Sequence, residues 1–394
     1  MTNDLTKLFR GTDTVLPEGD LEKRLEESGP LRVKLGMDPT APAVTLGWAV
    51  VLRKLRQFQE EGHTAVLIVG DFTAQVGDPS GKSETRRRLT AGEVRGHAES
   101  VLEGFRKVLL PDRLEIRYNS EWLATMDMAD VLDMTAQVTV AQMLERSDFA
   151  NRFDAHQPIS VMEFMYPLLQ GMDSVAVEAD VELGGADQLW NLMMGRVLQE
   201  RHGQRPQIAM TMPLLIGTDG EHKMSQSLGN YIGIDDAADD MFGKLMSIPD
   251  KLMVQYFELA TGVPLDEIAE IREGLASGEL HPGDVKRRLA REIVDLYHGA
   301  GAGTTSEAAF DQVFKRHEVP DEVPEYPLTG DDPVFLPVLL KEAGIVGSSS
   351  DGRRMLGQRA VKLNGAVVSE LEIDRASLVG AVLQVGKRRF VKLV

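Results

Sequence analysis

The sequence predicts an α/β protein whose first domain contains a parallel β-sheet. Residues 31–35 alternate apolar and polar side chains, as a strand end does, and residues 65–69 form a continuous apolar run typical of a buried parallel strand. Between them, a turn rich in Gly, Pro and Thr at residues 36–42 precedes apolar residues at helical spacing over 46–59. Strand, turn, helix and strand in this order form a βαβ unit, and ligands of such sheets lie beyond the carboxyl ends of the strands.

The remaining sequence predicts two further domains. Helical periodicity continues through residues 92–108 and 126–147, and a strand-like run covers residues 174–183. After a mostly helical stretch comes a segment rich in Pro, Glu and Asp, and then two short helical segments followed by strands. We therefore predict an α/β domain, an α-helical domain, a linker and a small α+β domain over residues 1–232, 233–318, 319–332 and 333–394, respectively.

Composition places the chain among soluble globular proteins, but its charge is unevenly distributed. The 394 residues are 43% hydrophobic and 26% charged, with a formal net charge of −18. Residues 333–394 contain ten Lys and Arg against five Asp and Glu, so this segment carries +5 and the remainder −23. A basic module on an acidic body is compatible with local RNA binding, and a randomly basic C-terminus is the alternative.

The absence of cysteine excludes disulfides, thiolate metal sites and cysteine nucleophiles. No apolar run approaches the roughly 20 residues that span a bilayer. The N-terminus lacks the basic and apolar regions of a signal peptide. We therefore expect a cytoplasmic protein that does not contact membranes.

Two short segments contain the strongest functional signal. Residues 36–48 read GMDPTAPAVTLGW and residues 223–230 read KMSQSLGN. A glycine-bearing turn that opens a helix presents unpaired backbone N–H groups to phosphates, and lysines in a mobile loop compensate charge on a leaving pyrophosphate. Either segment alone could be an ordinary turn or a solvated loop. The pair resembles the H-x-G-H and K-M-S-K-S signatures of class I aminoacyl-tRNA synthetases, and the whole chain is similar to the bacterial tyrosyl-tRNA synthetases.

In this resemblance three of the usual signature residues are replaced. Thr45 and Trp48 stand at the two histidine positions, and Gln226 stands at the second lysine. The family implies a Rossmann-like catalytic domain that takes ATP as a substrate, with Mg²⁺ accompanying ATP and neither a tightly bound cofactor nor a dedicated metal site. The catalytic residues it implies are Thr45, Trp48, Lys223 and Gln226, and the ATP-binding residues are Gly36, Asp38, Thr40, Gly47, Gly185, Asp187 and Lys223.

A pocket for tyrosine is implied by the same family. Tyr166, Gln170 and Asp173 follow the i, i+4 and i+7 spacing of one helix face, with Pro167 expected in the first turn. An exposed polar stripe is the alternative. The resemblance implies that Asp173 accepts the phenolic hydroxyl, since a buried acceptor favours tyrosine over phenylalanine. It places Tyr166 and Gln170 near the ammonium group, and completes the pocket with Lys34, Asp78, Asn119 and Gln188.

The C-terminal module resembles the small RNA-binding fold at the end of bacterial tyrosyl enzymes. The expected phosphate contacts are Arg353, Arg354, Lys387, Arg388 and Arg389. A basic tail without function is the alternative.

Three hypotheses for function follow from these observations. The first is a working tyrosine–tRNA ligase, whose partners would be tyrosine, tRNA and, by family resemblance, a second copy in a homodimer. The second is a catalytically impaired paralogue that binds tyrosine, a related amino acid or RNA in regulation or specialised metabolism. The third, an unrelated nucleotide-binding α/β enzyme, requires every matching segment to be coincidental.

Overall fold

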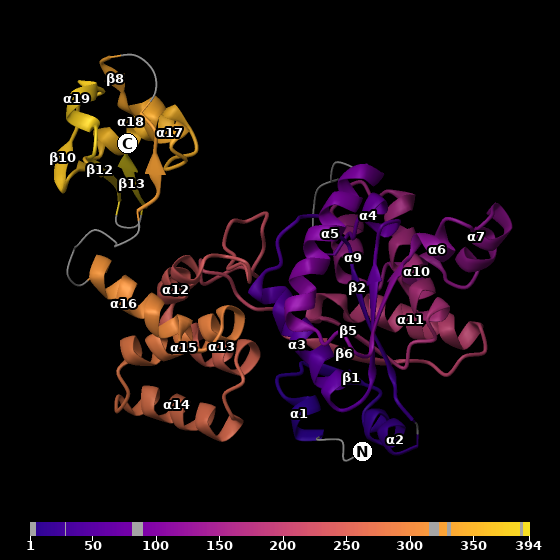
Figure 1. Cartoon of the computed structure of the whole chain (residues 1–394). Helices are drawn as coiled ribbons and strands as arrows, with labels where there is room; N and C mark the ends of the chain where they lie inside the picture. Colours follow the sequence, from indigo (N-terminus) through magenta and orange to yellow (C-terminus); the bar gives the residue numbers. More distant parts are fainter. Residues whose placement is uncertain (1–4, 28, 81–89, 315–322, 329–331, 387–388) are drawn as a thin grey trace. The chain divides into compact units, whose positions relative to one another are not determined.

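The computed structural model describes residues 5–27, 29–80, 90–314, 323–328, 332–386 and 389–394. The chain divides into two units, Met1–Ala300 and Gly301–Val394 (Figure 1). The domain boundaries expected at residues 232, 318 and 332 stay predictions. Most of the linker expected over 319–332 lies outside the described residues.

A six-stranded sheet forms the centre of the first unit. Its strand order is β1-β6-β5-β2-β3-β4, in which β1 is antiparallel to β6 and the other neighbours are parallel. This arrangement confirms the predicted parallel α/β sheet. The chain order reverses around β2, between β5 and β3, which is where such sheets bind ligands. The strands are β1 Thr14–Leu16, β2 Arg32–Met37, β3 Thr64–Val69, β4 Leu114–Tyr118, β5 Val181–Gly185 and β6 Ile208–Met212.

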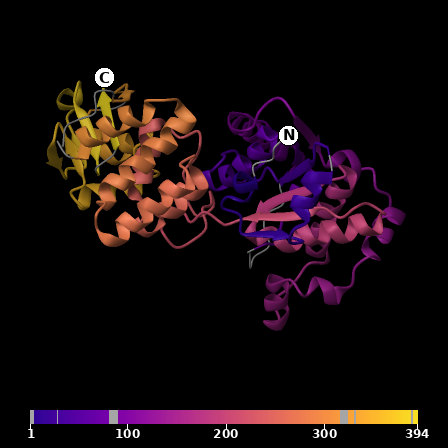
Figure 2. The same ribbon diagram turned by 90° about the horizontal axis from the view of Figure 1, so that it is seen from below.

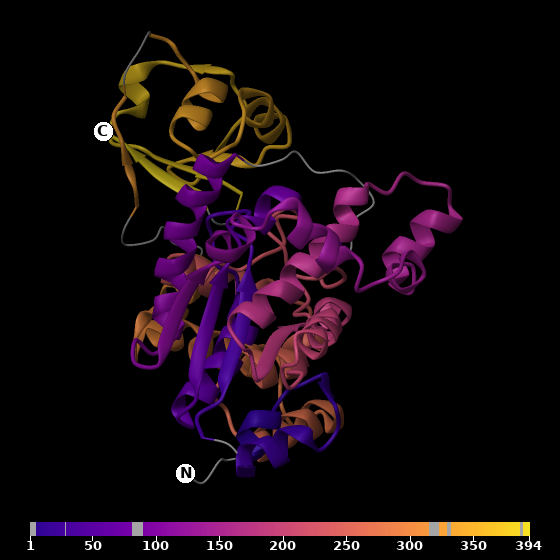
Figure 3. The same ribbon diagram turned by 90° about the vertical axis from the view of Figure 1, so that its right-hand side faces the viewer.

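Helices cover both faces of this sheet. Helices α3 Leu46–Glu60 and α5 Ala91–Val108 pack together on one face, and α10 Val161–Ala176 and α11 Leu189–Arg201 pack on the other (Figures 1 and 3). Opposite faces are expected, because right-handed crossovers on the two sides of a switch point lead the chain to opposite faces. The shorter helices of this part are α1 Leu5–Phe9, α2 Asp20–Glu27, α4 Thr73–Val76, α6 Ser120–Leu123, α7 Met128–Thr135, α8 Val140–Met143, α9 Ser147–Asp154 and the 3-10 turn η1 Ala186–Gln188.

Two of the predicted elements are wrong in extent. The helix expected over 126–147 is divided between α7 and α8, because Asp127 and Thr139 each form a capping box that starts a new helix. The strand expected over 174–183 begins only at Val181, because α10 continues to Ala176 to pack against α11. Apolar runs of this length are buried in either conformation, so the sequence alone does not separate them.

Pro167 also differs from its prediction. It lies inside α10 and not in the first turn, because the Ser160 side chain and Glu163 form a capping box that starts the helix at Val161. The proline leaves one backbone carbonyl of the preceding turn without its helical partner. The face shared by Tyr166, Gln170 and Asp173 is nonetheless helical throughout, as predicted.

The stretch after residue 235 is helical, as the sequence predicts. Breaks occur at Thr261–Pro264 and before Pro282, next to the Gly and Pro positions expected to interrupt it. These helices appear as the salmon and orange ribbons of Figure 2. They are α12 Ala238–Ser247, the 3-10 turn η2 Asp250–Leu252, α13 Met253–Ala260, α14 Leu265–Ser277 and α15 Pro282–His298, followed in the second unit by α16 Ala302–Phe314.

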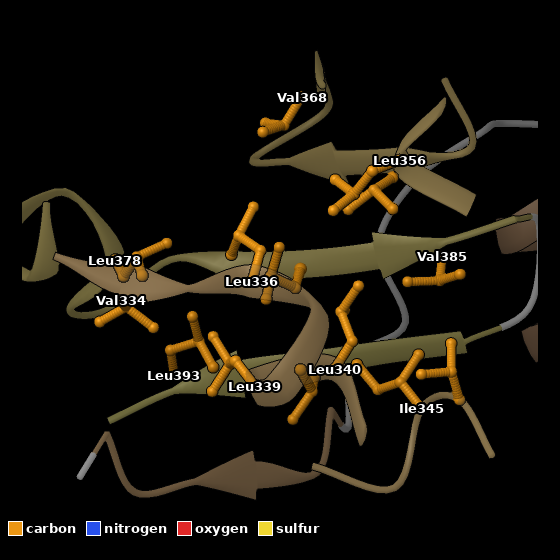
Figure 4. Close-up of a cluster of buried hydrophobic side chains, with 14 of the residues drawn as sticks. Val334, Leu336, Leu339, Leu340, Ile345, Leu356, Val368, Leu378, Val385 and Leu393 are labelled. Carbon is orange, nitrogen blue, oxygen red and sulfur yellow. The ribbon is translucent and has the colours of Figure 1, made fainter. Parts of the chain in front are cut away.

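The second unit ends in a small α+β module with its own core. Helices α17 Leu336–Glu342 and α18 Ser349–Gly357 pack against the sheet, and Leu336, Leu340 and Leu393 are fully buried in the core of the module (Figure 4). This module confirms the predicted order of elements, in which two helices are followed by strands. One sheet has the order β10-β9-β12-β13-β7 and the other pairs β11 with β8. The remaining elements are β7 Glu325–Tyr326, β8 Val334–Phe335, β9 Val361–Leu363, β10 Ala366–Val368, β11 Glu372–Ile373, α19 Arg375–Leu378, β12 Val382–Val385 and β13 Arg389–Leu393.

Candidate active site

The start of α3 lies at the carboxyl end of β2, as the sequence predicts. Thr45 is the N-cap residue, and its buried Oγ1 accepts the backbone N–H of Trp48 at 3.3 Å. The N–H of Leu46 donates to the carbonyl of Ile232. The N–H of Gly47 has no partner among the described residues, so it is the group that this helix start offers to an anion.

The second signature loop lies directly against the first. Gln226 Nε2 donates to the carbonyl oxygen of Ala43 at 2.5 Å. A Cβ atom on Gly47 would lie 3.6 Å from Cβ of Met224, so the two loops are in van der Waals contact. The structure therefore brings together two segments that lie almost 180 residues apart.

Lys223 links this loop to the end of β5. Its Nζ lies 2.7 Å from Asp187 Oδ2, and both side chains are partly exposed. The close approach depends on Gly185, where a Cβ would lie 2.8 Å from Asp187 Oδ1 and 2.9 Å from Leu214. The predicted ATP-binding residues of three different segments thus line one region.

Trp48 packs on α5 and lines a small cavity together with Asp38, Thr40 and Gln226. Its ring lies 5.9 Å from the ring of Phe105, at an angle of 45°. The cavity, of about 30 Å³, lies between these two rings, Thr40 and Gln226. That volume is about the share of one water molecule in the liquid, so the cavity beside Trp48 is too small for a nucleotide.

Asp173 is buried and already holds two hydrogen bonds. Trp122 Nε1 donates to Oδ1 at 2.9 Å, and Asn119 Nδ2 donates to Oδ2 at 3.3 Å. Burial raises the pKa of Asp173 to about 7, against the lowering effect of the Lys34 charge and the two donors. A carboxylate has more lone pairs than these two donors occupy, so it can still accept a hydroxyl.

A hydrogen-bond chain leads from Asp173 to a second buried carboxyl group, that of Asp38. Asn119 Nδ2 also donates to Thr73 Oγ1 at 2.9 Å, and Thr73 Oγ1 donates to Asp38 Oδ1 at 2.7 Å. Tyr166 donates its hydroxyl to Asp38 Oδ2 at 3.0 Å. Burial raises the pKa of Asp38 to about 7. Asp38, predicted to bind ATP, is thus in direct contact with the predicted tyrosine pocket.

Lys34 lies behind this chain and is fully buried. Its Nζ forms an ion pair with Glu182 at 2.9 Å and donates to Ser174 Oγ at 2.8 Å and to the Gln170 carbonyl at 3.0 Å. Lys34 and Glu182 are register partners on the neighbouring strands β2 and β5. Because Glu182 neutralises its charge, Lys34 has a structural role beneath the hydrogen-bond chain. The Gln170 side chain donates to the same Glu182, so this ion pair also fixes Gln170.

Asp78 and Gln188, the remaining residues of the predicted tyrosine pocket, contact each other. Gln188 Nε2 donates to Asp78 Oδ2 at 2.9 Å, and the backbone N–H of Ser80 donates to Oδ1 at 2.8 Å. Arg146 approaches the same carboxylate at 3.8 Å, and the Asp78 side chain is 25% exposed. That exposure leaves the carboxylate accessible to an ammonium group.

Sequence reasoning did not find four residues of this site. Trp122 and Thr73 hold the two buried carboxyl groups, Glu182 neutralises Lys34, and Arg146 approaches Asp78. Glu182 did carry a signal, because a charged residue within a buried parallel strand requires a partner. The others are recognised only from contacts more than 30 residues apart in sequence.

The sequence of this chain is similar to those of a known protein family. A family model described as tRNA synthetases class I (W and Y) matches residues 26–315. The chain belongs to this family. Two relatives, both named tyrosine–tRNA ligase, come from Moorella thermoacetica (52% identical, covering 100% of this chain and 96% of the relative) and Geobacter sulfurreducens (48% identical, 100% and 99%).

Solved structures of class I synthetases share the fold. Tyrosyl-tRNA synthetase from Archaeoglobus fulgidus, complexed with L-tyrosine, is similar with a TM-score of 0.62 and 22% identity over 77% of this chain and 98% of that one. The truncated mitochondrial enzyme of Aspergillus nidulans gives 0.64 and 22%, over 77% and 92%. These likenesses confirm the predicted α/β architecture.

The C-terminal basic residues expected to contact RNA differ in their surroundings. Arg353 lies over the ring of Phe335 at 5.4 Å, Arg354 pairs with Asp351 at 3.0 Å and is more than half exposed, and Arg389 donates to the Ile345 carbonyl. Lys387 and Arg388 lie outside the described residues. RNA binding by this synthetase module stays a prediction.

In the described part of the chain, no three His, Asp or Glu side chains gather in a way that could hold a metal ion. None of the helices in that part has the length and apolar character needed to cross a bilayer.

Proposed function

We propose that this chain is a tyrosine–tRNA ligase, which activates tyrosine with ATP and transfers the tyrosyl group to tRNA. The observation that carries the proposal is that Asp173 and Asp78 both lie near Asp38, a residue of the first signature segment, since their charges add to the effect of burial in raising its pKa. Asp173, a buried acceptor, and Asp78, an accessible carboxylate, fit a phenol and an ammonium group. The two relatives described above, alike over their full length, are named for this reaction.

The reaction has two steps, both acyl or phosphoryl transfers. In the first, the tyrosine carboxylate attacks the α-phosphorus of ATP, and pyrophosphate leaves as the tyrosyl-adenylate forms. In the second, a ribose hydroxyl of the tRNA attacks the tyrosyl carbonyl, and AMP leaves. Neither step needs a covalent intermediate on the protein, so catalysis depends on positioning and charge compensation.

The residues present divide this work as follows. Asp78 binds the ammonium group of tyrosine, and Gln188, which donates to Asp78, lies close enough to contact the carboxylate of tyrosine. Lys223 compensates negative charge on the phosphates after leaving Asp187. Thr45 and Gln226 contribute neutral donors in place of charged ones.

Magnesium fits as a companion of ATP. Mg²⁺ commonly binds through one or two carboxylates together with substrate phosphates, and not in a cage of protein ligands. Asp187, which lies beside Lys223, is the carboxylate nearest the expected phosphates. It would supply one oxygen ligand to the ion that ATP brings.

The partners we propose are tRNA and a second copy of this chain. Large apolar side chains are exposed along the short helices that follow β4, and α7 stands out from the sheet in Figures 1 and 3. These side chains are Met128, Leu132, Val140, Phe153 and Val161, each 59% exposed or more. Such a patch supports a homodimer contact, which sedimentation of wild type and Leu132→Asp tests. We expect the cytoplasm as location, where tRNA is charged.

Charging of tRNA with labelled tyrosine tests the proposal. We expect tyrosyl-tRNA to form with ATP present and not without it. Phenylalanine serves as the control amino acid and should give no product, because it leaves the Asp173 acceptor unpaired. Absence of charging with tyrosine, in protein that binds tyrosine normally, would contradict the proposal and favour the impaired paralogue.

A further inference from the structure

A second cavity, larger than the one beside Trp48, lies at the other end of α3. It has a volume of about 830 Å³ and is lined by residues of α1, α3, the end of α5, the α13–α14 loop and the end of α15, all within the first unit. Cavities of roughly 300–1,000 Å³ hold small-molecule ligands in other proteins. None of its lining residues belongs to the candidate active site.

The cavity is strongly basic. Lys7, Arg10, Arg53, Arg56 and Lys107 line it, against only two carboxylates, those of Glu60 and Asp266. In a chain with a net charge of −18, a concave surface lined by five cationic side chains is unexpected. Walls of low dielectric concentrate such a potential and attract anions.

Three of these five cations form ion pairs with carboxylates. Lys7 pairs with Glu60 at 2.5 Å and Glu61 at 3.6 Å, Arg56 pairs with Glu60 at 3.0 Å, and Lys107 pairs with Asp235. Arg10 donates only to main-chain carbonyl oxygens of Phe257, Glu258 and Thr261, and its Nη1 has no partner among the described residues.

Arg53 has the fewest contacts of these cations. It forms no hydrogen bond or ion pair with any described residue, although it is partly buried. Burial and the like charge of Arg56 lower its pKa, but a guanidinium stays protonated at neutral pH. Glu60, which Lys7 and Arg56 already share, and Tyr297 attract Arg53 and oppose this lowering, but neither forms an ion pair or hydrogen bond with it in the described part of the chain.

Tyr297 adds a second polar group without a partner. Its hydroxyl oxygen is buried and makes no hydrogen bond in the described part of the chain. Burial raises its pKa to about 12, so the hydroxyl remains a neutral donor. The Arg53 charge opposes this increase, so the hydroxyl lies near that guanidinium and can donate to a ligand that Arg53 binds.

We propose that this cavity binds a small organic molecule with two or more phosphate charges. The guanidinium groups of Arg53 and Arg10 and the Tyr297 hydroxyl would bind the phosphates, and Val108, Leu265 and Leu296 would contact the apolar portion. The proposal does not depend on the ligase reaction. An RNA backbone is a less suitable occupant, because these donors line a concavity sized for one small molecule.

Calorimetric titration of the full chain with inorganic tripolyphosphate tests the proposal. Arg53→Gln should weaken binding about tenfold or more, because a charge-assisted contact is lost. Lys223→Gln, which alters the phosphate region of the candidate active site, should leave this binding unchanged. Arg205→Gln is the matched surface control, since Arg205 is half exposed and pairs with Asp20 and Glu27.

A second variant protects the test against misfolding. Tyr297→Phe removes only an unpaired hydroxyl, so the fold should persist, and we expect tripolyphosphate binding to weaken about threefold. Equal binding by wild type and both cavity variants would overturn the proposal. So would binding that is lost only in Lys223→Gln, or a cavity that binds a short RNA in an Arg53-dependent manner but no tripolyphosphate.

Discussion

The proposed tyrosine side of the site, around Asp173 and Asp38, and the proposed nucleotide side, around the signature loops, are constructed differently. On the tyrosine side, Asp173 and Asp38 are buried and joined through Asn119 and Thr73 by hydrogen bonds of 2.7–3.3 Å. On the nucleotide side, the contacts are few, partly exposed and made by flexible side chains such as Lys223. A buried carboxyl group needs preorganised donors, whereas phosphates can be bound by mobile cations and backbone groups.

This difference explains which substitutions the site contains. Thr45, Trp48 and Gln226 all lie on the nucleotide side, where one side chain can change without leaving a buried charge unpaired. Thr45 caps α3, and Gln226 bonds to the Ala43 carbonyl, so both have structural contacts of their own. Removing any one member of the tyrosine-side network would leave buried polar groups unsatisfied.

The largest effect is expected from breaking the tyrosine side. Asp173→Ala removes the proposed acceptor and leaves the Trp122 and Asn119 donors unpaired, so kcat/KM for tyrosine should fall about 100-fold or more. Pyrophosphate exchange at varied tyrosine concentration measures it. Asp154→Ala, an exposed aspartate of α9, is the control and should behave as wild type. An unchanged KM for tyrosine in Asp173→Ala would place the phenol elsewhere.

A smaller effect is expected on the nucleotide side. Lys223→Ala removes the cation that faces the phosphates, and kcat for exchange should fall about 10- to 100-fold. The KM for tyrosine should stay constant, because Lys223 touches no residue of the Asp173 chain. Lys251→Ala on η2 is the exposed-lysine control. A comparable rise in the KM for tyrosine would erase the distinction between the two sides.

The sequence predicted the helix face of Tyr166, Gln170 and Asp173 because i, i+4 and i+7 spacing is a local property. It also predicted the parallel strands over residues 31–35 and 65–69, because strand, turn, helix and strand follow one another locally. It did not predict Trp122 as a partner of Asp173, since the two lie 51 residues apart and meet only through tertiary packing. Capping boxes explain two further errors, the division of the helix expected over 126–147 and the early start of α10.

The pH dependence of tyrosine binding should further distinguish the tyrosine side from the nucleotide side, because only the tyrosine side contains Asp173 and Asp38. Burial raises the pKa of Asp173 and Asp38 from ordinary values near 4 to about 7, so both groups lose protons as the pH rises through 7. Since the ionised form is the stronger acceptor, tyrosine affinity should increase roughly tenfold between pH 6 and 8. Equilibrium dialysis with labelled tyrosine measures it. A flat profile, or one that falls with pH, would show that Asp173 binds as the neutral acid.

The same two groups should also affect stability. Their folded pKa lies above the unfolded value, so the folded state holds protons that the unfolded chain has released. The free energy of unfolding should therefore decrease as the pH rises from about 4 to 7. Urea unfolding of wild type and Asp38→Asn, compared at pH 5 and 8, separates this contribution from the rest of the chain.

The smallest effect is expected from adding a charge back. Gln226→Lys keeps a donor for the Ala43 carbonyl and adds a cation near the phosphates, so kcat for exchange should rise about threefold to tenfold. Gln226→Met, similar in size but without donor or charge, is the matched control and should lower it. A loss of rate in Gln226→Lys would mean that the loop is adjusted to a neutral residue.

Tyrosine-dependent exchange of labelled pyrophosphate into ATP tests the central claim most directly, because it requires both sides of the site and no tRNA. The altered signature loops beside an intact tyrosine pocket predict exchange with wild-type protein, saturating with tyrosine and absent with phenylalanine. No exchange, in protein that binds tyrosine with normal affinity, would contradict the account.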